Sequence, residues 1–332
     1  MESNLKYGSF HLVKMALFLR KLSEEKFFSK RTELKLSKLI TYSLLDQRWF
    51  QLTADITGYK ENKISGETVE KFIDELHKSN IHNAYYYSLG ILKYTPEDLS
   101  QLLLNLGSIY IPDTIGHSIS CFFPVITDII NSEHPVKGTA LFSIISYLSR
   151  FPYPEDILEK SLEQTKPQDY DRILKISSSG DGIVNLHHMI TFFILLSWEN
   201  ASFNHKKIVP YNIFLNWIKD KEIDRNQEEK VLKLKKVNKQ IDNYTDFRKL
   251  FSPDNPEESI DTFIFLLDTI PEKAIDWIFR IYPDYYTPNW DPHYITSIYC
   301  AIRLYLSRDI DDKISAKMAV YQAIKYFLNN NI

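Results

Sequence analysis

Residues 12–28, LVKMALFLRKLSEEKFF, carry apolar side chains at positions three and four apart. This spacing places the apolar side chains on one face of an α-helix and most of the charged ones on the other. Residues 34–52 repeat the pattern, and Thr95-Pro-Glu-Asp-Leu99 has the proline and acidic residues typical of a helix start. Alternation with a period of two, expected of a strand, is nearly absent. The sequence therefore predicts an all-α fold.

The composition supports the same fold class. Of the 332 residues, 44% are hydrophobic and 14% are aromatic, as in a well-packed globular protein. Only nine are glycine, the residue that hairpins and phosphate-binding loops need for their left-handed backbone positions. The chain has no Gly-x-Gly-x-x-Gly segment and no phosphate-loop lysine motif. We therefore expect no flavin or nicotinamide site of the doubly wound kind.

A polar linker from Gly58 to Gly66 marks one weak boundary. We expect an N-terminal helical extension over residues 1–65 and one all-α domain over residues 66–332. In this prediction the domain is a multi-helical array packed around a central histidine-lined cavity.

Charge and targeting signals indicate a soluble protein of the cytoplasm. The net charge of −3 gives no basic footprint for nucleic acid or for an acidic membrane surface. The start lacks the features of a secretory signal, and no apolar run reaches transmembrane length. Two cysteines are too few for a disulfide framework. The sequence does not define the oligomeric state.

Three segments read histidine, any residue, isoleucine, hydroxyl residue: His117-Ser-Ile-Ser120, His188-Met-Ile-Thr191 and His293-Tyr-Ile-Thr296. Each leads into a strongly apolar, aromatic-rich stretch, which places the histidine in the first turns of a helix. His82 begins a similar stretch and is the fourth member of the set. The positive end of the helix dipole favours neutral imidazole, the form that binds metal ions.

Neighbouring residues fit this interpretation. The hydroxyl residue lies on the same helix face as its histidine and can hydrogen-bond the imidazole or a ligand. Asp113, Asp181 and Asp291 lie close upstream as candidate partners of the rings. The sequence thus predicts a metal site built from four histidines: His82, His117, His188 and His293. A substrate pocket beside it would be lined by aromatic residues: Tyr85, Tyr86, Phe122, Phe192 and Tyr294.

Two simpler interpretations stay open. A histidine at a buried helix start is commonly a capping or core hydrogen-bonding residue, and aromatic side chains commonly fill a core. His187 competes with His188 as the inward residue, because neighbouring helix positions point about 100° apart. His11, His77, His134 and His205 fall outside the pattern and receive no role.

The histidine segments, in their order, resemble the questin oxidase-like family. The resemblance rests on four stretches that together span roughly Val69 to the end: Asn80-Ile-His82-Asn-Ala-Tyr85 with Pro96-Glu-Asp-Leu99, Ile115-Gly-His117-Ser-Ile119 with the helix 137–151, Leu186-His-His188-Met-Ile-Thr191, and Asp291-Pro-His293-Tyr-Ile295 with the helix 314–327.

The resemblance implies an all-α oxygenase acting on an aromatic polyketide-type substrate, by Baeyer–Villiger-like oxygen insertion or ring cleavage. It also implies histidine-bound non-haem iron and NADPH as cofactors. Thr296 stands where the family commonly has a lysine, which could supply an oxygen ligand once carbamylated. We therefore expect weak or absent iron in the purified protein. The runner-up function is a catalytically inactive helical scaffold that binds a partner protein.

Overall fold

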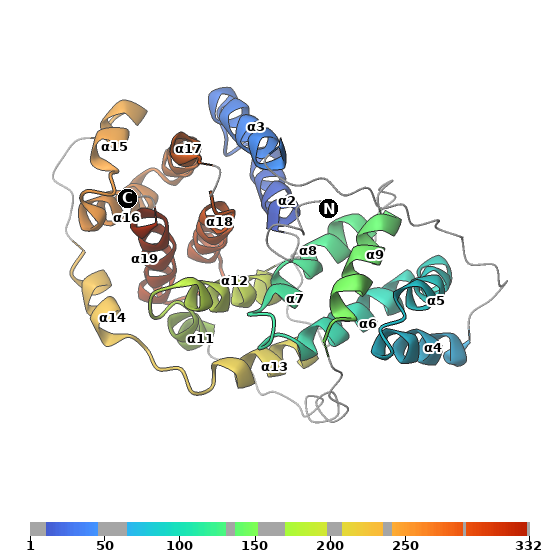
Figure 1. The fold of residues 1–332 in the computed structure, drawn as a ribbon. Coiled ribbons are helices and arrows are strands. Elements are labelled where there is room, and N and C mark those ends of the chain that lie inside the picture. Colours follow the sequence, from blue (N-terminus) through green and yellow to red (C-terminus); the bar gives the residue numbers. More distant parts are fainter. Residues whose placement is uncertain are drawn as a thin grey trace. The chain divides into compact units, whose positions relative to one another are not determined.

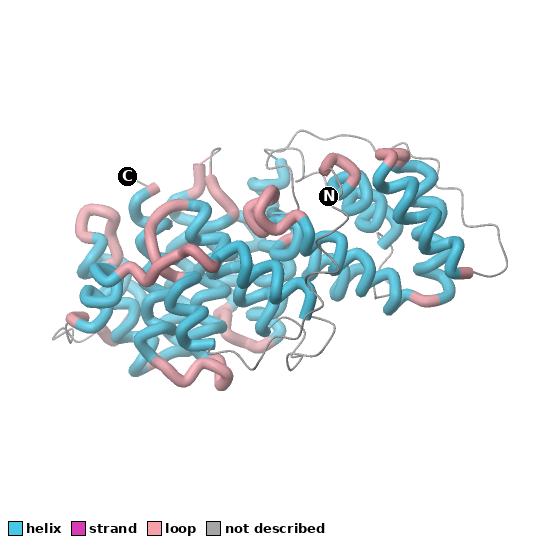
Figure 2. Tube along the Cα trace, turned by 90° about the horizontal axis from the view of Figure 1, so that it is seen from below, coloured by secondary structure: helices cyan, strands magenta, loops and turns pink. Residues whose placement is uncertain are grey.

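A computed structural model describes residues 11–45, 65–130, 137–151, 170–197, 208–234, 241–287 and 290–330. These residues form helices joined by turns and loops, with no strand among them (Figures 1 and 2). The predicted all-α fold is confirmed for this part of the chain.

The chain divides into two compact units, each built from separate segments. The first unit contains residues 1–13, 48–166 and 194–219, and the second contains residues 14–47, 167–193 and 220–332. Helices α2 (His11–Glu24) and α12 (Ile183–Ser197) each contribute residues to both units. The expected linker before Gly66 lies almost entirely in residues 46–64, outside the described part of the chain.

The remaining elements of the first unit are short to medium helices: α4 (Gly66–His77), α5 (Ile81–Tyr94), α6 (Pro96–Ile109), α7 (His117–Ser120), α8 (Phe122–Val125), the π-helix η1 (Ile126–Ile130), α9 (Lys137–Leu148) and α13 (Ile208–Ile218). Helix α5 packs against α4, α6 and α9, and α6 also packs against α13. The core of this unit is therefore built around α5 and α6.

The approach of α7 to α6 depends on Gly107. A Cβ atom at this position would lie 2.8 Å from the carbonyl oxygen of Ser118, closer than real Cβ atoms come to backbone. The turn before α7 is also unusual, because Ile115 has a φ of 52° and Gly116 one of 77°. This left-handed turn starts α7 at His117.

The second unit holds the other helices: α3 (Lys30–Leu45), α11 (Tyr170–Ser177), α14 (Arg225–Leu232), α15 (Tyr244–Leu250), α16 (Pro256–Thr269), α17 (Pro271–Ile281), the 3₁₀ helix η4 (Tyr282–Tyr285), α18 (His293–Leu306) and α19 (Lys313–Asn329). Helix α19 packs against α11, α14, α16 and α18, and α3 packs against α17. Tyr282 and Phe327 stack with ring centroids 3.9 Å apart in this core.

Helix starts follow the sequence signals. Proline occupies the first turn of α6, α16 and α17, as expected from its lack of an N–H group. Ser65 begins α4, and its N–H donates to Thr68 Oγ1 at 3.2 Å. The side chains of Asp224, Asn255 and Asp312 accept backbone N–H groups at the starts of their helices.

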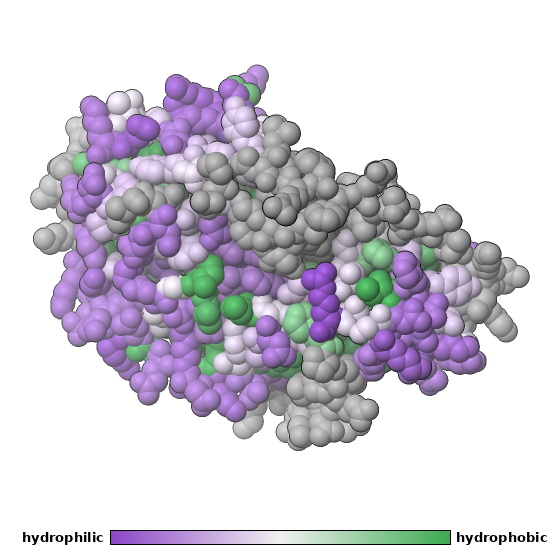
Figure 3. Space-filling model, viewed as in Figure 1, coloured by the Kyte–Doolittle hydropathy of each residue, from purple (hydrophilic) through white to green (hydrophobic). Residues whose placement is uncertain are grey.

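The described residues visible in Figure 3 are mostly hydrophilic, with small separate hydrophobic patches among them. Six large hydrophobic side chains are exposed among the described residues: Leu34, Tyr42, Tyr94, Val184, Leu232 and Leu306. No helix in the described part of the chain is both long enough and apolar enough to cross a membrane.

Candidate metal centre

His187 and His293 form a pair inside the second unit. Helix α12 begins at Ile183, after Gly180 and Gly182 at φ values of 83° and 91°, so His187 lies one turn into it. Helix α18 begins at His293 itself. The two Nε2 atoms lie 2.9 Å apart. The residues are 1% and 5% exposed, so both imidazoles are removed from water.

The other nitrogen of each ring is held by an acceptor. His187 Nδ1 donates to the carbonyl oxygen of Ile183 at 2.7 Å, and His293 Nδ1 donates to Asp291 Oδ1 at 2.6 Å. Asp291 Oδ2 accepts from Tyr326 Oη at 2.7 Å. Burial raises the pKa of Asp291, but the electrostatic attraction of the His293 ring and hydrogen bonds from His293 and Tyr326 outweigh it and lower the pKa to about 2. Asp291 is therefore a carboxylate that fixes the His293 ring.

These acceptors define the tautomers of the pair. A carbonyl oxygen and a carboxylate only accept, so both Nδ1 atoms carry the proton. In neutral imidazoles both Nε2 atoms then present lone pairs, which face each other across 2.9 Å. Two facing lone pairs repel unless a cation lies between them. A metal ion or a shared proton satisfies this arrangement.

The distance between the two nitrogens agrees with metal coordination. Imidazole nitrogens bind zinc at about 2.0–2.1 Å, so two ligands at right angles are about 2.9 Å apart and tetrahedral ligands about 3.3 Å. The observed separation of 2.9 Å corresponds to the right angle. Right angles occur in six-coordinate centres, which include non-haem iron sites, and in square-planar copper and nickel sites. The same 2.9 Å is also the length of an ordinary hydrogen bond, as a shared proton would give.

The first unit contains a second histidine pair. His11 is the first residue of α2 and His117 the first residue of α7, and their Nε2 atoms also lie 2.9 Å apart. His11 is 1% exposed, whereas His117 is half-buried. Among the described residues, the four histidines of the two pairs are candidate metal ligands.

His188, the ligand that the sequence analysis preferred over His187, has a different neighbour. Its Nδ1 accepts from Lys221 Nζ at 3.1 Å, and the same amine donates to the carbonyl oxygen of Ser177 at 3.2 Å. Burial lowers the pKa of Lys221 to about 7. Burial and the nearby charge of Lys221 lower the pKa of His188 to about 3. His188 is thus a neutral acceptor near neutral pH.

The remaining predicted ligand, His82, is exposed on α5. Its ring lies 6.0 Å from that of Phe142. Of the four predicted histidines, His117 and His293 therefore belong to the two pairs, whereas His82 and His188 do not. The pairs are completed by His11 and His187. The sequence did contain an indication for His11. Like the histidines of the motif, it directly precedes an apolar helical run, here residues 12–28.

The aromatic residues predicted to line a pocket are largely buried against other rings. In the first unit, Tyr85 lies beside Phe142, Tyr86 beside Tyr87, and Phe122 beside Tyr147. In the second unit, Phe192 lies beside Tyr170, and Tyr294 lies beside Trp290, Tyr326 and Phe327. Of these five aromatic residues, Tyr294 lies next to Tyr326, whose hydroxyl group donates a hydrogen bond to Asp291.

Of the aspartates and hydroxyl residues that were expected to hydrogen-bond the imidazoles, one aspartate does so. Asp291 bonds His293, as expected, whereas Asp181 forms an ion pair with Lys325 at 2.8 Å. Asp113 is exposed. The hydroxyl oxygens of Ser120, Thr191 and Thr296 are buried and have no hydrogen-bond partner among the described residues.

A buried amine lies close to the face of α18 that carries His293. Lys14 is 0% exposed, and its Nζ has no hydrogen-bond partner in the described part of the chain. Its charge acts on Cys300, which follows His293 by two helical turns and so lies on the same face of α18. Buried polar groups are normally hydrogen-bonded, so this amine calls for an accepting partner.

Comparison of the chain with family models, with curated proteins and with solved structures finds no match. The resemblance to the questin oxidase-like family therefore stays a prediction from the motifs.

Proposed function

We propose that the protein binds a transition metal through its paired histidines and that this centre serves an oxidoreductase acting on an aromatic substrate. The observation that carries the proposal is the His187–His293 pair. Its Nε2 lone pairs face each other at 2.9 Å while both Nδ1 protons are held by acceptors. An aspartate–histidine pair of this kind is the usual support of a metal-bound imidazole.

Non-haem iron is the metal that we favour. The right-angle spacing of the nitrogens fits six-coordinate geometry, and imidazole ligands suit iron as well as zinc or copper. The motif resemblance points to the same metal, to NADPH as electron donor and to a flat aromatic polyketide-type substrate. When bound, iron would supply the one-electron and oxygen chemistry that such an oxidation needs.

The residues of the chain have separate roles in this proposal. His187 and His293 bind the metal, and Asp291 holds the His293 ring in the tautomer with Nε2 unprotonated. The buried Lys14 amine would donate a hydrogen bond to an oxygen atom of the substrate. The carbonyl oxygen of Ile183 orients His187 in the same way as Asp291 orients His293.

Metal analysis of the purified protein tests the proposal most directly. After reconstitution with ferrous iron and desalting, we expect bound metal in the wild-type protein and a loss of at least tenfold in affinity in His187→Ala and in His293→Ala. His77→Ala, at the exposed end of α4, is the matched control and should bind as the wild type does. The ion-to-chain ratio counts the sites, and His11→Ala and His117→Ala show whether the first-unit pair contributes ligands.

Activity is tested separately from metal binding. NADPH-dependent oxygen uptake with hydroxylated anthraquinones should occur in the reconstituted protein and be lost in His293→Ala. If neither iron, zinc nor copper binds, the cation between His187 and His293 is a shared proton, and the helical scaffold becomes the better interpretation. If metal binds but no aromatic substrate is oxidised, the metal site stands and the oxidoreductase assignment is wrong.

A further inference from the structure

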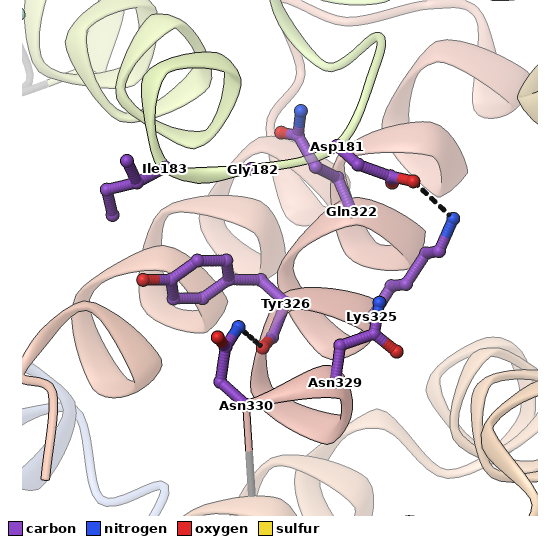
Figure 4. Close-up of a pocket in the computed structure, with 8 residues that line it drawn as sticks. All are labelled: Asp181, Gly182, Ile183, Gln322, Lys325, Tyr326, Asn329 and Asn330. Carbon is purple, nitrogen blue, oxygen red and sulfur yellow. Dashed lines mark hydrogen bonds and ion pairs between the residues drawn. The ribbon is translucent and has the colours of Figure 1, made fainter.

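The second unit has a pocket of about 370 Å³ between the turn that precedes α12 and the C-terminal end of α19. It is lined by Asp181 to Ile183 on one side and by residues of α19 and its C-terminal end on the other (Figure 4). The lining residues of α19 and its end are Gln322, Lys325, Tyr326, Asn329 and Asn330. The volume lies in the range of small-molecule sites, roughly 300–1,000 Å³.

Gln322 presents an unsatisfied acceptor in this wall. The residue is 3% exposed, and its Nε2 donates to the carbonyl oxygen of Gly180 at 3.0 Å. That bond identifies the amide nitrogen, because a carbonyl oxygen can only accept. The remaining atom, Oε1, is buried and has no hydrogen-bond partner among the described residues. Buried acceptors are normally satisfied, so Oε1 calls for an N–H or O–H donor from a ligand.

The charges at the rim cancel. Asp181 and Lys325 form an ion pair at 2.8 Å across the pocket edge, with side chains 65% and 25% exposed. In Figure 4 this pair lies on one side of Gln322, and the ring of Tyr326 extends on the other side, towards Ile183. The pocket therefore offers no uncompensated charge to a ligand and favours an uncharged one.

Two further groups have fixed orientations. Tyr326 Oη donates to Asp291, so the ring presents an apolar face in the pocket wall. Asn330 Nδ2 donates to the carbonyl oxygen of Tyr326 at 2.7 Å, which leaves its Oδ1 to act as an acceptor. The wall thus combines amide acceptors with a flat apolar surface.

We propose that this pocket binds an uncharged, polyhydroxylated small molecule of about monosaccharide size. Its hydroxyl groups would donate to Gln322 Oε1 and Asn330 Oδ1, and its C–H face would pack on the ring of Tyr326. A phosphorylated or carboxylated ligand fits less well, because Lys325 is already neutralised by Asp181.

The pocket walls also hold the second-unit histidine pair. Ile183 supplies the carbonyl oxygen that accepts from His187, and Tyr326 donates to the carboxylate that holds His293. Occupation of the pocket is therefore coupled to the orientation of both rings. This coupling rests on the proposed function, whereas the binding itself does not.

The test of binding uses metal-free full-length protein, so that it is independent of the histidines. Glucose and myo-inositol are titrated against it by isothermal calorimetry or ligand-observed NMR, with glucose 6-phosphate and benzyl alcohol as charged and apolar comparisons. We expect saturable binding of a neutral polyol with a dissociation constant on the order of millimolar. Absence of saturation by either polyol, or tighter binding of glucose 6-phosphate, would overturn the proposal.

Two variants localise the binding. Gln322→Leu removes the acceptor and should weaken binding about fivefold, whereas Gln101→Leu on α6 is the matched control and should leave it unchanged. Asn329→Ala changes an exposed lining residue without disturbing the core and should weaken binding by a smaller factor. If Gln322→Leu and Asn329→Ala both bind the polyol as tightly as the wild type, the polyol binds elsewhere and the assignment is wrong.

Coupling is measured on the reconstituted protein. Saturating polyol should change metal affinity severalfold in the wild type, and Tyr326→Phe should abolish this change while keeping polyol binding, since the ring remains. If the polyol binds but metal affinity is unaffected, the coupling is wrong and the pocket assignment stands. If no metal binds at all, the proposed function fails and the polyol titration still decides the pocket.

Discussion

The two histidine pairs have the same Nε2 separation, 2.9 Å, but are held in different ways. In the second unit both rings are fixed through their Nδ1 atoms, one by a main-chain carbonyl and one by Asp291. In the first unit the position of His117 depends on the main chain. It follows a left-handed turn at Ile115 and Gly116 and starts a helix of four residues packed against Gly107.

The difference separates two means of preorganising an imidazole. Hydrogen bonds to the ring select both its orientation and its tautomer, and they act locally. Backbone placement fixes where the ring starts, and it depends on packing between helices. Loss of the Asp291 carboxylate should therefore disturb the second-unit pair, and changes in the packing of α7 should disturb the first-unit pair.

Asp291→Asn should have the largest effect. The amide keeps the shape of the side chain but can no longer accept as a carboxylate, so it loses the tautomer control on His293. Metal affinity measured by competition with a chelator should fall about 10–100-fold. Asp74→Asn, which changes an exposed carboxylate of α4 paired with Lys78 instead, is the control. Equal affinities in Asp291→Asn and the wild type would show that the anchoring of His293 is not functional.

Gly107→Ala tests the backbone placement of the first-unit pair. The added Cβ would meet the Ser118 carbonyl at 2.8 Å and force α7 away from α6. We expect the free energy of unfolding to fall by about 1–3 kcal/mol in urea titrations. In Gly66→Ala the added Cβ meets open space, so stability should stay unchanged or rise by up to about 1 kcal/mol. A stable Gly107→Ala would mean that the approach of α7 can relax at little cost.

Thr296→Lys tests whether a lysine on α18 can add a metal ligand beside His293. Thr296 lies one turn after His293, is fully buried, and its hydroxyl has no partner among the described residues. A lysine there would add an oxygen ligand if it is carbamylated, as the motif resemblance implies. Iron content of the protein as purified should then rise a fewfold. An unchanged iron content, with the variant still folded by circular dichroism, would contradict the role assigned to this position.

A further prediction concerns the pH dependence of stability at Lys221. Its pKa is about 7 in the folded state, against 10.5 as the ordinary value, so the unfolded chain binds more protons between these two values. The free energy of unfolding therefore rises with pH between about 7 and 10.5. It falls again as the pH is lowered towards 7, because the lysine of the unfolded chain then takes up a proton while the buried amine stays neutral. Relative to Lys221→Met, the wild type should gain stability from pH 7 to 10. Parallel pH profiles of the two proteins would show that Lys221 titrates normally.

Much of the fold could be predicted, because helix signals are local. The proline at the start of α6 and the Ser65 start of α4 can be recognised from a few neighbouring residues. Of the four histidines that the motif identified, His117 and His293 each lie next to another imidazole.

The partners in those pairs could not be predicted, because they depend on long-range packing. His11 lies 106 residues from His117. The sequence shows that His11 precedes an amphipathic run, but it does not show which histidine it will contact. The choice between His187 and His188 depends on the rotation of α12 about its axis, since the two side chains point about 100° apart. The role of Asp291 was accessible, because an aspartate two residues before a helix-starting histidine can reach its ring.

The two cysteines allow the opening of each unit to be measured separately. Cys121 lies in the first unit and Cys300 in the second, and both are thiols that are 0% exposed. A thiol reagent can reach each one only when its surroundings open, so the labelling rate of each reports the opening frequency of its own unit. Mass spectrometry of partly labelled protein would give the two rates in one experiment. Each unit thus contains its own natural probe of local opening.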